Sequence, residues 1–213
     1  TGRPLTLGWT AENAPAILEA WHGGSQAGHA IADVLFGDTN PSGKLPVAFP
    51  RSVGQLPMTY AHKNTGRPGP EPGVTWSAYT DSPNDPLYPF GYGLSYTTFT
   101  YSEPKLSASE IGLGGSVQVS VTITNAGKRA GVEVAQLYVR DLVGSVTRPV
   151  RELKGFQKVD LQPGQSREVT FTLKASDLAF YTAAGKWEAE PGAFKVFVGG
   201  NSRDVKEAGF NLK

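Results

Sequence analysis

The chain of 213 residues contains no cysteine, a single methionine and three histidines. Without cysteine it can form no disulfide, no thiolate metal site and no thiol nucleophile. It also lacks an excess of either charge, because 20 lysines and arginines balance 19 aspartates and glutamates and leave a net charge of +1. A balanced charge without a basic run argues against a nucleic-acid surface or an acidic-membrane surface.

Long apolar runs are absent as well. No stretch approaches the roughly 18 apolar residues that a membrane span needs, and Thr1-Gly2-Arg3-Pro4 has neither the apolar core nor the cleavage site of a secretion signal. Since the chain starts at Thr1 and its only methionine is Met58, we expect a processed product or part of a longer protein. Apolar residues make up 39% of the chain and charged residues 18%, which is enough apolar material for a packed core.

Glycine and proline are plentiful, with 26 and 16 residues respectively. Proline is densest in residues 61–92, which also contain four glycines, and it excludes regular helix and sheet ladders there. Loops of this length in compact proteins are either functional or disordered. Because Trp76, Tyr79 and Tyr88 make this segment more aromatic than disordered linkers usually are, we expect an ordered loop lying over a surface.

Residues 1–60 carry helical patterns. Leu5 to Trp9 alternates like a short strand, and from Glu12 onward a helix facing a core is predicted by the helical spacing of Ala14, Ile17, Leu18 and Trp21. A second helix is predicted to start after Ser25 as N-cap and to stop at Gly37. Its buried stripe is expected to consist of Ala27, Ile31, Val34 and Leu35. The segment therefore reads as the end of an α/β layer.

The periodicity changes to two after Phe99. Apolar residues alternate with polar ones in 117–124, 169–173 and 194–198, a further strand is predicted at 132–139, and turns are predicted at 125–127, 163–164, 185 and 191–192. Short strands at about ten-residue intervals predict an antiparallel sandwich of about seven strands, of the immunoglobulin or fibronectin type III kind. The predicted division is 1–60, a linker at 61–98, and the sandwich at 99–213.

A complete active site is not evident. His22-Gly23-Gly24-Ser25 precedes a helix, where free amides could hold an anion, but a simple tight turn is the better interpretation. A serine nucleophile with a histidine base and a metal site at His22 and His29 are both weakly supported. Carboxylate pairs such as Asp33/Asp38 or Asp81/Asp85 could do glycosidase work, but their separation in space cannot be read from the sequence.

Aromatic residues are the remaining candidates for binding. The residues from Tyr88 to Tyr101 are expected to attach the loop to the domains. Trp76 and Tyr79 could equally well stack on a sugar ring or pin the loop.

Several stretches together resemble the C-terminal third of glycoside hydrolase family 3, of the bacterial periplasmic β-glucosidase type, and they cover nearly the whole chain in order. They are residues 1–5, 16–21, 30–38, 40–46 (Asn-Pro-Ser-Gly-Lys-Leu-Pro), 88–96 (Tyr-Pro-Phe-Gly-Tyr-Gly-Leu-Ser-Tyr) and 148–156 (Arg-Pro-Val-Arg-Glu-Leu-Lys-Gly-Phe).

The resemblance implies a parent of three parts: a (β/α)₈-like barrel, an α/β sandwich domain and a fibronectin type III-like domain. Such enzymes are retaining, with an Asp nucleophile on the barrel and a Glu acid on the second domain. Both belong to segments upstream of Gly2, so the resemblance assigns no catalytic residue to this chain.

The sequence therefore predicts the C-terminal part of a retaining β-glucosidase that acts as scaffold and active-site rim and is inactive alone. The rival hypotheses are a non-catalytic carbohydrate-binding module and a sandwich that binds proteins. Trp76 and Tyr79 are the predicted substrate-binding residues. The resemblance implies no cofactor and no metal, and a periplasmic or secreted location. It also implies that the full-length enzyme acts on β-glucosides or oligosaccharides. It is compatible with a homodimer.

Overall fold

The computed structural model describes residues 1–67 and 76–213, so the part of the expected loop at 68–75 lies outside the described residues. Two helices precede the strands, α1 (Gly8–Asn13) and α2 (Ala27–Phe36), and two 3-10 helices occur at η1 (Val53–Gln55) and η2 (Ala175–Leu178). The strands are β1 (Phe99–Tyr101), β2 (Lys105–Leu106), β3 (Glu110–Ile111), β4 (Ser116–Asn125), β5 (Gly131–Asp141), β6 (Glu152–Leu161), β7 (Ser166–Lys174), β8 (Phe180–Tyr181), β9 (Trp187–Glu188), β10 (Gly192–Gly199) and β11 (Val205–Leu212).

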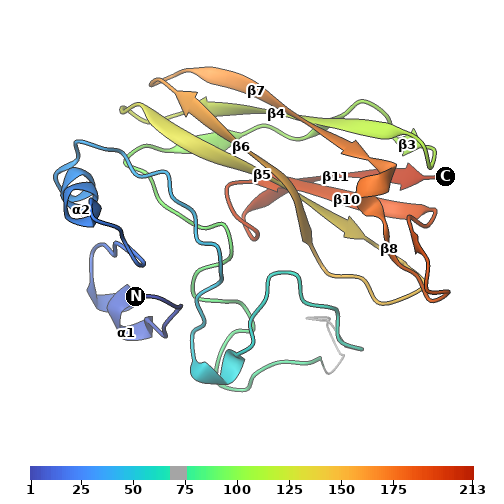
Figure 1. Ribbon diagram of the computed structural model, residues 1–213, viewed down its shortest axis with the longest axis horizontal. Helices are drawn as coiled ribbons and strands as arrows, with labels where there is room; N and C mark the ends of the chain where they lie inside the picture. Colours follow the sequence, from blue (N-terminus) through green and yellow to red (C-terminus); the bar gives the residue numbers. More distant parts are fainter. Residues whose placement is uncertain (68–75) are drawn as a thin grey trace.

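The strands form two sheets packed face to face (Figure 1). In the first sheet, β4 pairs with β1 and β2 and also with β7; in the second, the order is β3-β11-β10-β5-β6. Neighbouring strands are antiparallel except for the short β3, which runs parallel to β11. Strands β8 and β9 form a separate small hairpin. This arrangement confirms the predicted fibronectin type III-like sandwich.

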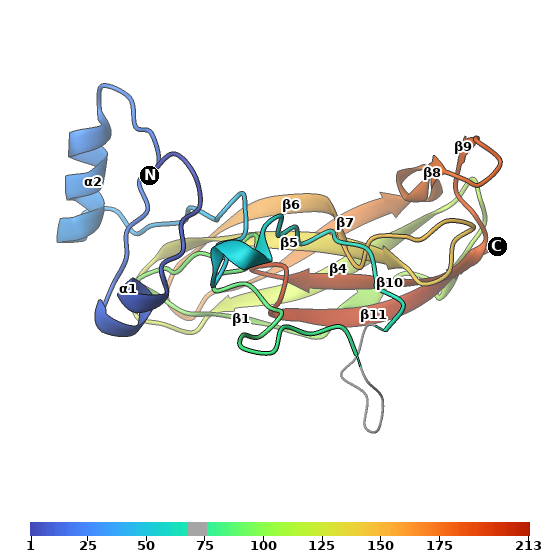
Figure 2. The same ribbon diagram turned by 90° about the horizontal axis from the view of Figure 1, so that it is seen from below.

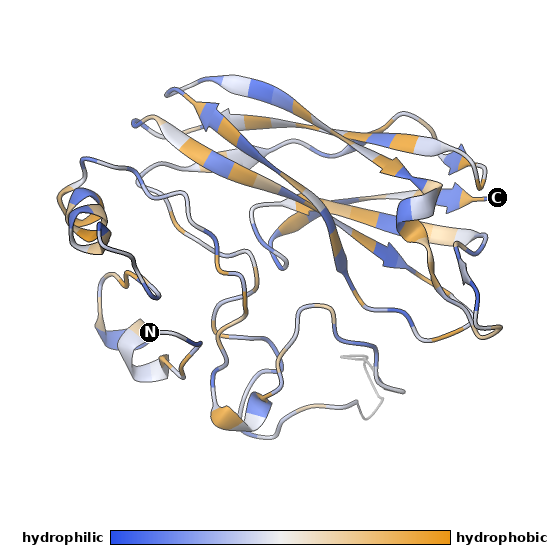
Figure 3. Cartoon of the chain, in the orientation of Figure 1, coloured by the Kyte–Doolittle hydropathy of each residue, from blue (hydrophilic) through white to orange (hydrophobic). Residues whose placement is uncertain are grey.

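The core of the sandwich consists of the alternating apolar residues that the sequence predicts. Val117, Val119 and Ile123 of β4 face Val196 and Val198 of β10, and all five are fully buried. The residues between them are mostly polar, so hydrophilic and hydrophobic colours alternate along the long strands in Figure 3. Because successive side chains of a strand point to opposite faces, these polar residues lie on the outer face. The hydrophobic effect therefore fixes both the face and the register of each long strand.

The sequence underestimates the number of strands. Strands β6 and β11 were not predicted, and β1, β2 and β3 are too short to show an alternating pattern. The predicted corners do occur, and Gly164 and Gly185 have φ angles of 74° and 72°, in the left-handed region that favours glycine.

The first predicted elements of residues 1–60 are wrong. Leu5 to Trp9 does not form a strand, and the helix expected from Glu12 is replaced by α1, which ends at Asn13. The reason is Pro15, because the residue before a proline is driven out of the helical region. Ala14 accordingly has φ −99° and ψ 129°, and the chain continues irregularly through Trp21.

The second helix is largely as predicted. It occupies Ala27–Phe36 and ends at Gly37, whose φ is 84°. Ser25 is not its N-cap, since Gln26 holds that position and no side chain caps the helix. The expected stripe is not fully buried, because Leu35 is 64% exposed and Ala27, Ile31 and Val34 are only half-buried. No helix among the described residues is long and apolar enough to cross a membrane.

Residues 45–62 and 76–98 run along the outer face of the second sheet, and both helices lie at the end of the molecule opposite to the C-terminus (Figures 1 and 2). In the described part of 61–92 no helix or strand forms, apart from single bridges of Lys63 with Pro149 and of Tyr88 with Phe49. The expectation of an ordered loop lying over a surface is confirmed for these described residues.

Candidate functional site

An aromatic cluster attaches the loop to the second sheet. Tyr60 stacks on Phe90 with ring centroids 4.2 Å apart, and both rings meet the edge of Tyr138 on β5. The Tyr60 hydroxyl also accepts a hydrogen bond from the backbone N–H of Leu153 at 3.2 Å. Tyr138 is fully buried although it points away from the sandwich core, so the loop provides a second, smaller core on the outer face of the sheet.

Two glycines in the Tyr88–Tyr96 motif let the loop approach the sheet closely. Gly91 has φ 79°, and a Cβ at this position would lie 2.1 Å from Oε1 of Gln136. At Gly93 a Cβ would lie 2.1 Å from the carbonyl oxygen of Gly43. The Gln136 amide donates to the carbonyls of Gly91 at 3.1 Å and Gly200 at 2.6 Å, so this close approach is fixed by hydrogen bonds.

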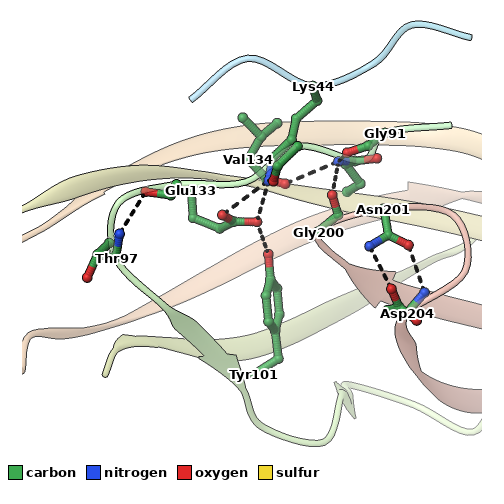
Figure 4. Close-up of polar contacts among 12 residues, drawn as sticks. Lys44, Gly91, Thr97, Tyr101, Glu133, Val134, Gly200, Asn201 and Asp204 are labelled. Atoms are coloured by element: carbon green, nitrogen blue, oxygen red, sulfur yellow. Dashed lines mark hydrogen bonds and ion pairs between the residues drawn. The ribbon is translucent and has the colours of Figure 1, made fainter. Parts of the chain in front are cut away.

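A buried ion pair holds the Asn40–Pro46 motif against the sandwich (Figure 4). Lys44 Nζ lies 3.3 Å from Glu133 Oε1 and donates to the carbonyl of Gly93 at 3.0 Å. The Tyr101 hydroxyl donates to the same Glu133 oxygen at 3.0 Å. The side chains of Lys44 and Glu133 are 14% and 6% exposed, so each charge depends on the other for neutralisation.

This network has a structural role. Burial raises the pKa of Tyr101, and the negative charge of Glu133 raises it further, so the phenol stays protonated and serves as a donor. The Glu133 carboxylate is occupied by Lys44 and Tyr101 and is not free to attack or protonate a substrate. Lys44 belongs to the Asn40–Pro46 motif that the sequence singles out. Its partner Glu133 is distant in the sequence and belongs to no recognisable motif.

A cleft of about 450 Å³ opens between the loop and the second sheet. Its sheet wall carries Arg140 of β5 together with Lys195 and Phe197 of β10, and its loop wall includes Tyr60 and Phe90. The cleft therefore combines cations with aromatic surface.

The two predicted binding residues lie elsewhere on the loop. Tyr79 is 45% exposed, and its hydroxyl donates to the carbonyl of Gly54 at 3.2 Å. Its backbone N–H donates to Asn84 Oδ1 at 3.1 Å, so both ends of Tyr79 are held. Trp76 is half-buried. Among the residues that the structure describes, neither of them lines the cleft.

The other chemical hypotheses gain no support. The tight turn predicted for this stretch lies at Gly24–Ala27, with Ser25 and Gln26 at its centre, and is closed by a hydrogen bond from Ala27 N to Gly24 O at 3.0 Å. Within residues 1–67 and 76–213, no three histidine or acidic side chains gather as a metal site would require.

The fold and its contacts define a two-part molecule. One part is a fibronectin type III-like sandwich, and the loop packs on the outer face of its second sheet. The other part is the N-terminal segment, whose apolar residues are exposed. Comparison with known families agrees with this class. Residues 1–96 match the glycosyl hydrolase family 3 C-terminal domain, and residues 133–202 match the fibronectin type III-like domain.

The chain belongs to glycoside hydrolase family 3, of which it represents the C-terminal portion. It is 53% identical to a periplasmic β-glucosidase of Salmonella typhimurium, over 99% of the chain and 28% of that protein. It is 46% identical to a β-xylosidase of Formosa agariphila, over 100% of the chain and 29% of that protein. The crystal structure of a Listeria innocua β-glucosidase in complex with glucose superposes with a TM-score of 0.93 at 44% identity, over 99% of the chain and 29% of that structure. The chain thus spans less than a third of these relatives.

Proposed function

We propose that this chain is the C-terminal part of a retaining β-glucosidase and that it serves as scaffold and active-site rim. The observation that carries the proposal is the similarity to β-glucosidases along 99% of the chain, combined with a coverage of only 28% of the relative's length. The catalytic Asp and Glu then lie outside these residues. Locating the nucleophile of the full-length enzyme upstream of residue 1 tests the proposal.

The exposed apolar residues of the first segment support this proposal. They lie on and around α1 and α2 and comprise Leu5, Trp9, Ile17, Leu18, Leu35 and Phe36. Apolar side chains gathered in this way mark a surface that is covered by another element. We assign that element to the part of the α/β domain that precedes this chain. A free-standing carbohydrate- or protein-binding sandwich would not require such a segment, which makes that alternative the weaker one.

We further propose the division into the end of the α/β domain at 1–60, a linker at 61–98, and the fibronectin type III-like domain at 99–213. The parent is proposed to act on terminal β-glucosyl groups in the periplasm or outside the cell. The name of the Salmonella typhimurium relative, a periplasmic β-glucosidase, supports both the location and the substrate class.

Trp76 and Tyr79 are proposed to contribute to an outer subsite for sugar or aglycone. Tyr79 presents its ring to solvent while its hydroxyl and backbone are held by Gly54 and Asn84. An aromatic ring fixed in this way offers a flat apolar face to the C–H groups of a glucose ring. Trp76 precedes it on the same loop and offers the larger face.

The Trp76→Ala variant of the full-length enzyme is expected to lose about 5- to 30-fold in kcat/KM for a disaccharide, equivalent to about 1–2 kcal/mol. The loss for 4-nitrophenyl β-glucoside should be smaller, because this substrate does not reach an outer subsite. The measurement is steady-state kinetics with both substrates.

Tyr79→Phe serves as the control, since it keeps the ring and removes only the hydrogen bond to Gly54. It should retain disaccharide activity within about twofold. An equal loss for both substrates in Trp76→Ala, together with a lower melting temperature, would show that Trp76 only pins the loop.

A further inference from the structure

The register of the second sheet brings cations together on its outer face. Arg140 of β5 is the direct cross-strand partner of Lys195 on β10, so both side chains point to the same side. Like charges at opposed positions repel each other and destabilise a sheet. Lys195 is relieved by Glu207 of β11, whose carboxylate lies 2.6 Å from its ammonium group. Arg140 forms no ion pair with any residue that the structure describes.

A second guanidinium faces the same cleft. Arg151 lies 4.5 Å above the ring of Phe197, and one of its N–H groups donates to the carbonyl of Ser202. Burial lowers the pKa of Arg151, and Arg140 lowers it further, while Tyr138 and Glu207 act in the opposite direction. In the described parts of the chain Arg151, like Arg140, has no carboxylate as an ion-pair partner.

The carboxylates of the cleft do not balance these cations. Its lining holds Arg140, Arg151, Lys195 and Arg203 against Asp85 and Glu207, and Glu207 is already engaged by Lys195. Arg203 is paired with Asp204 at the surface. Cations that are partly desolvated, close together and not neutralised by carboxylates are typical of sites where a bound anionic ligand supplies the negative charge.

The other walls indicate the kind of ligand. Tyr60 and Phe90 place half-buried aromatic rings in the lining of the same cleft, and Phe197 lies buried beneath the guanidinium of Arg151. A guanidinium presents a planar fork of donors that matches a carboxylate, and aromatic rings pack against the C–H face of a sugar. A volume of about 450 Å³ is in the range of small-molecule sites.

We propose that this cleft binds a sugar acid, with Arg140 and Arg151 holding its carboxylate and the aromatic walls contacting its ring. Inorganic phosphate shares the oxyanion chemistry but cannot use the aromatic walls. D-Glucose has the same ring without the carboxylate. Phosphate therefore measures the contribution of the negative charge to binding, and glucose measures the contribution of the sugar ring.

The experiment is a calorimetric titration of the full 213-residue chain at low salt with D-glucuronate, D-glucose and inorganic phosphate. Glucuronate is expected to bind at least about tenfold more tightly than either of the others, because only it engages both the guanidinium pair and the rings. Its affinity should fall as the salt concentration rises. Phosphate binding as tightly as glucuronate would overturn the sugar-acid assignment, and so would binding of glucose with equal affinity.

Arg140→Gln is the test variant, because Arg140 makes no hydrogen bond or ion pair within the described residues and its loss relieves the repulsion with Lys195. We expect an unchanged or higher melting temperature and a loss of at least about tenfold in glucuronate affinity. Arg167→Gln, at an exposed position near the start of β7 in the other sheet, makes the same charge change and should keep the affinity within about twofold. An equal effect of the two variants, or an Arg140→Gln chain that is folded and binds normally, would overturn the proposal.

Discussion

The isolated chain is expected to show no hydrolysis of 4-nitrophenyl β-glucoside above the uncatalysed rate. A retaining glycosidase needs two carboxyl groups about 5–5.5 Å apart, one as nucleophile and one as acid. The most deeply buried carboxylates here, Glu133 and Asp141, are engaged by Lys44 and Arg148 respectively. A thiol nucleophile is excluded because the chain has no cysteine, and Ser25, the candidate serine, lies in a simple turn.

The measurement is the release of 4-nitrophenol by the purified chain, compared with that by the full-length enzyme at equal molar concentration. We expect the isolated chain to give the rate of buffer alone. Turnover that survives repurification and disappears on substitution of an aspartate within residues 1–213 would contradict the assignment of the catalytic residues to other segments.

Asn125→Ala is expected to destabilise the sandwich by about 3 kcal/mol, which for a protein of this size lowers the melting temperature by about 10 °C. Asn125 is 0% exposed, and its amide donates to the carbonyls of Arg129 at 2.7 Å and Leu161 at 3.0 Å. Its oxygen accepts from the hydroxyl of Thr97 at 2.6 Å and from the N–H of Gly127 at 3.0 Å. Alanine would leave these buried groups without partners.

Thr124→Ala is the matched control for this variant. Thr124 is the neighbouring residue on β4, and its hydroxyl makes only an exposed hydrogen bond with Ser166 at 2.7 Å. We expect it to cost less than about 1 kcal/mol. Thermal unfolding followed by circular dichroism measures both variants. Similar melting temperatures for the two would show that the Asn125 network contributes little to stability.

The strands of the sandwich that bury only one of their two faces were predictable from the sequence. Strands β4, β7 and β10 each place alternate residues in one core, so their apolar residues recur at a period of two. Strand β6 escaped prediction because it is an edge strand, paired only with β5, and residues 156–158 at its middle are exposed. In β11, Ala208 and Gly209 interrupt the pattern.

The first segment was harder to predict, for a physical reason. Leu18 and Leu35 are exposed in the described chain, so contacts within it do not explain the apolar pattern around them, and we assign those contacts to the proposed preceding part of the α/β domain. The helical spacing of Ala14, Ile17 and Leu18 predicts a helix across Pro15, but proline keeps Ala14 out of the helical region. The arginine-lined cleft could not be foreseen from the sequence, because Arg140 and Lys195 meet only through the register of β5 and β10, and Arg151, which precedes β6, joins them only in the lining of the cleft.

The most direct test of the account is to trap the glycosyl-enzyme in the full-length protein. A 2-deoxy-2-fluoro-β-glucoside with a good leaving group forms this intermediate in a retaining enzyme but releases it slowly, and mass spectrometry of peptides then locates the labelled carboxylate. We predict a single labelled aspartate upstream of residue 1 and no label on any peptide from residues 1–213. A label on a carboxylate within this chain, such as Asp33 or Asp85, would contradict the account.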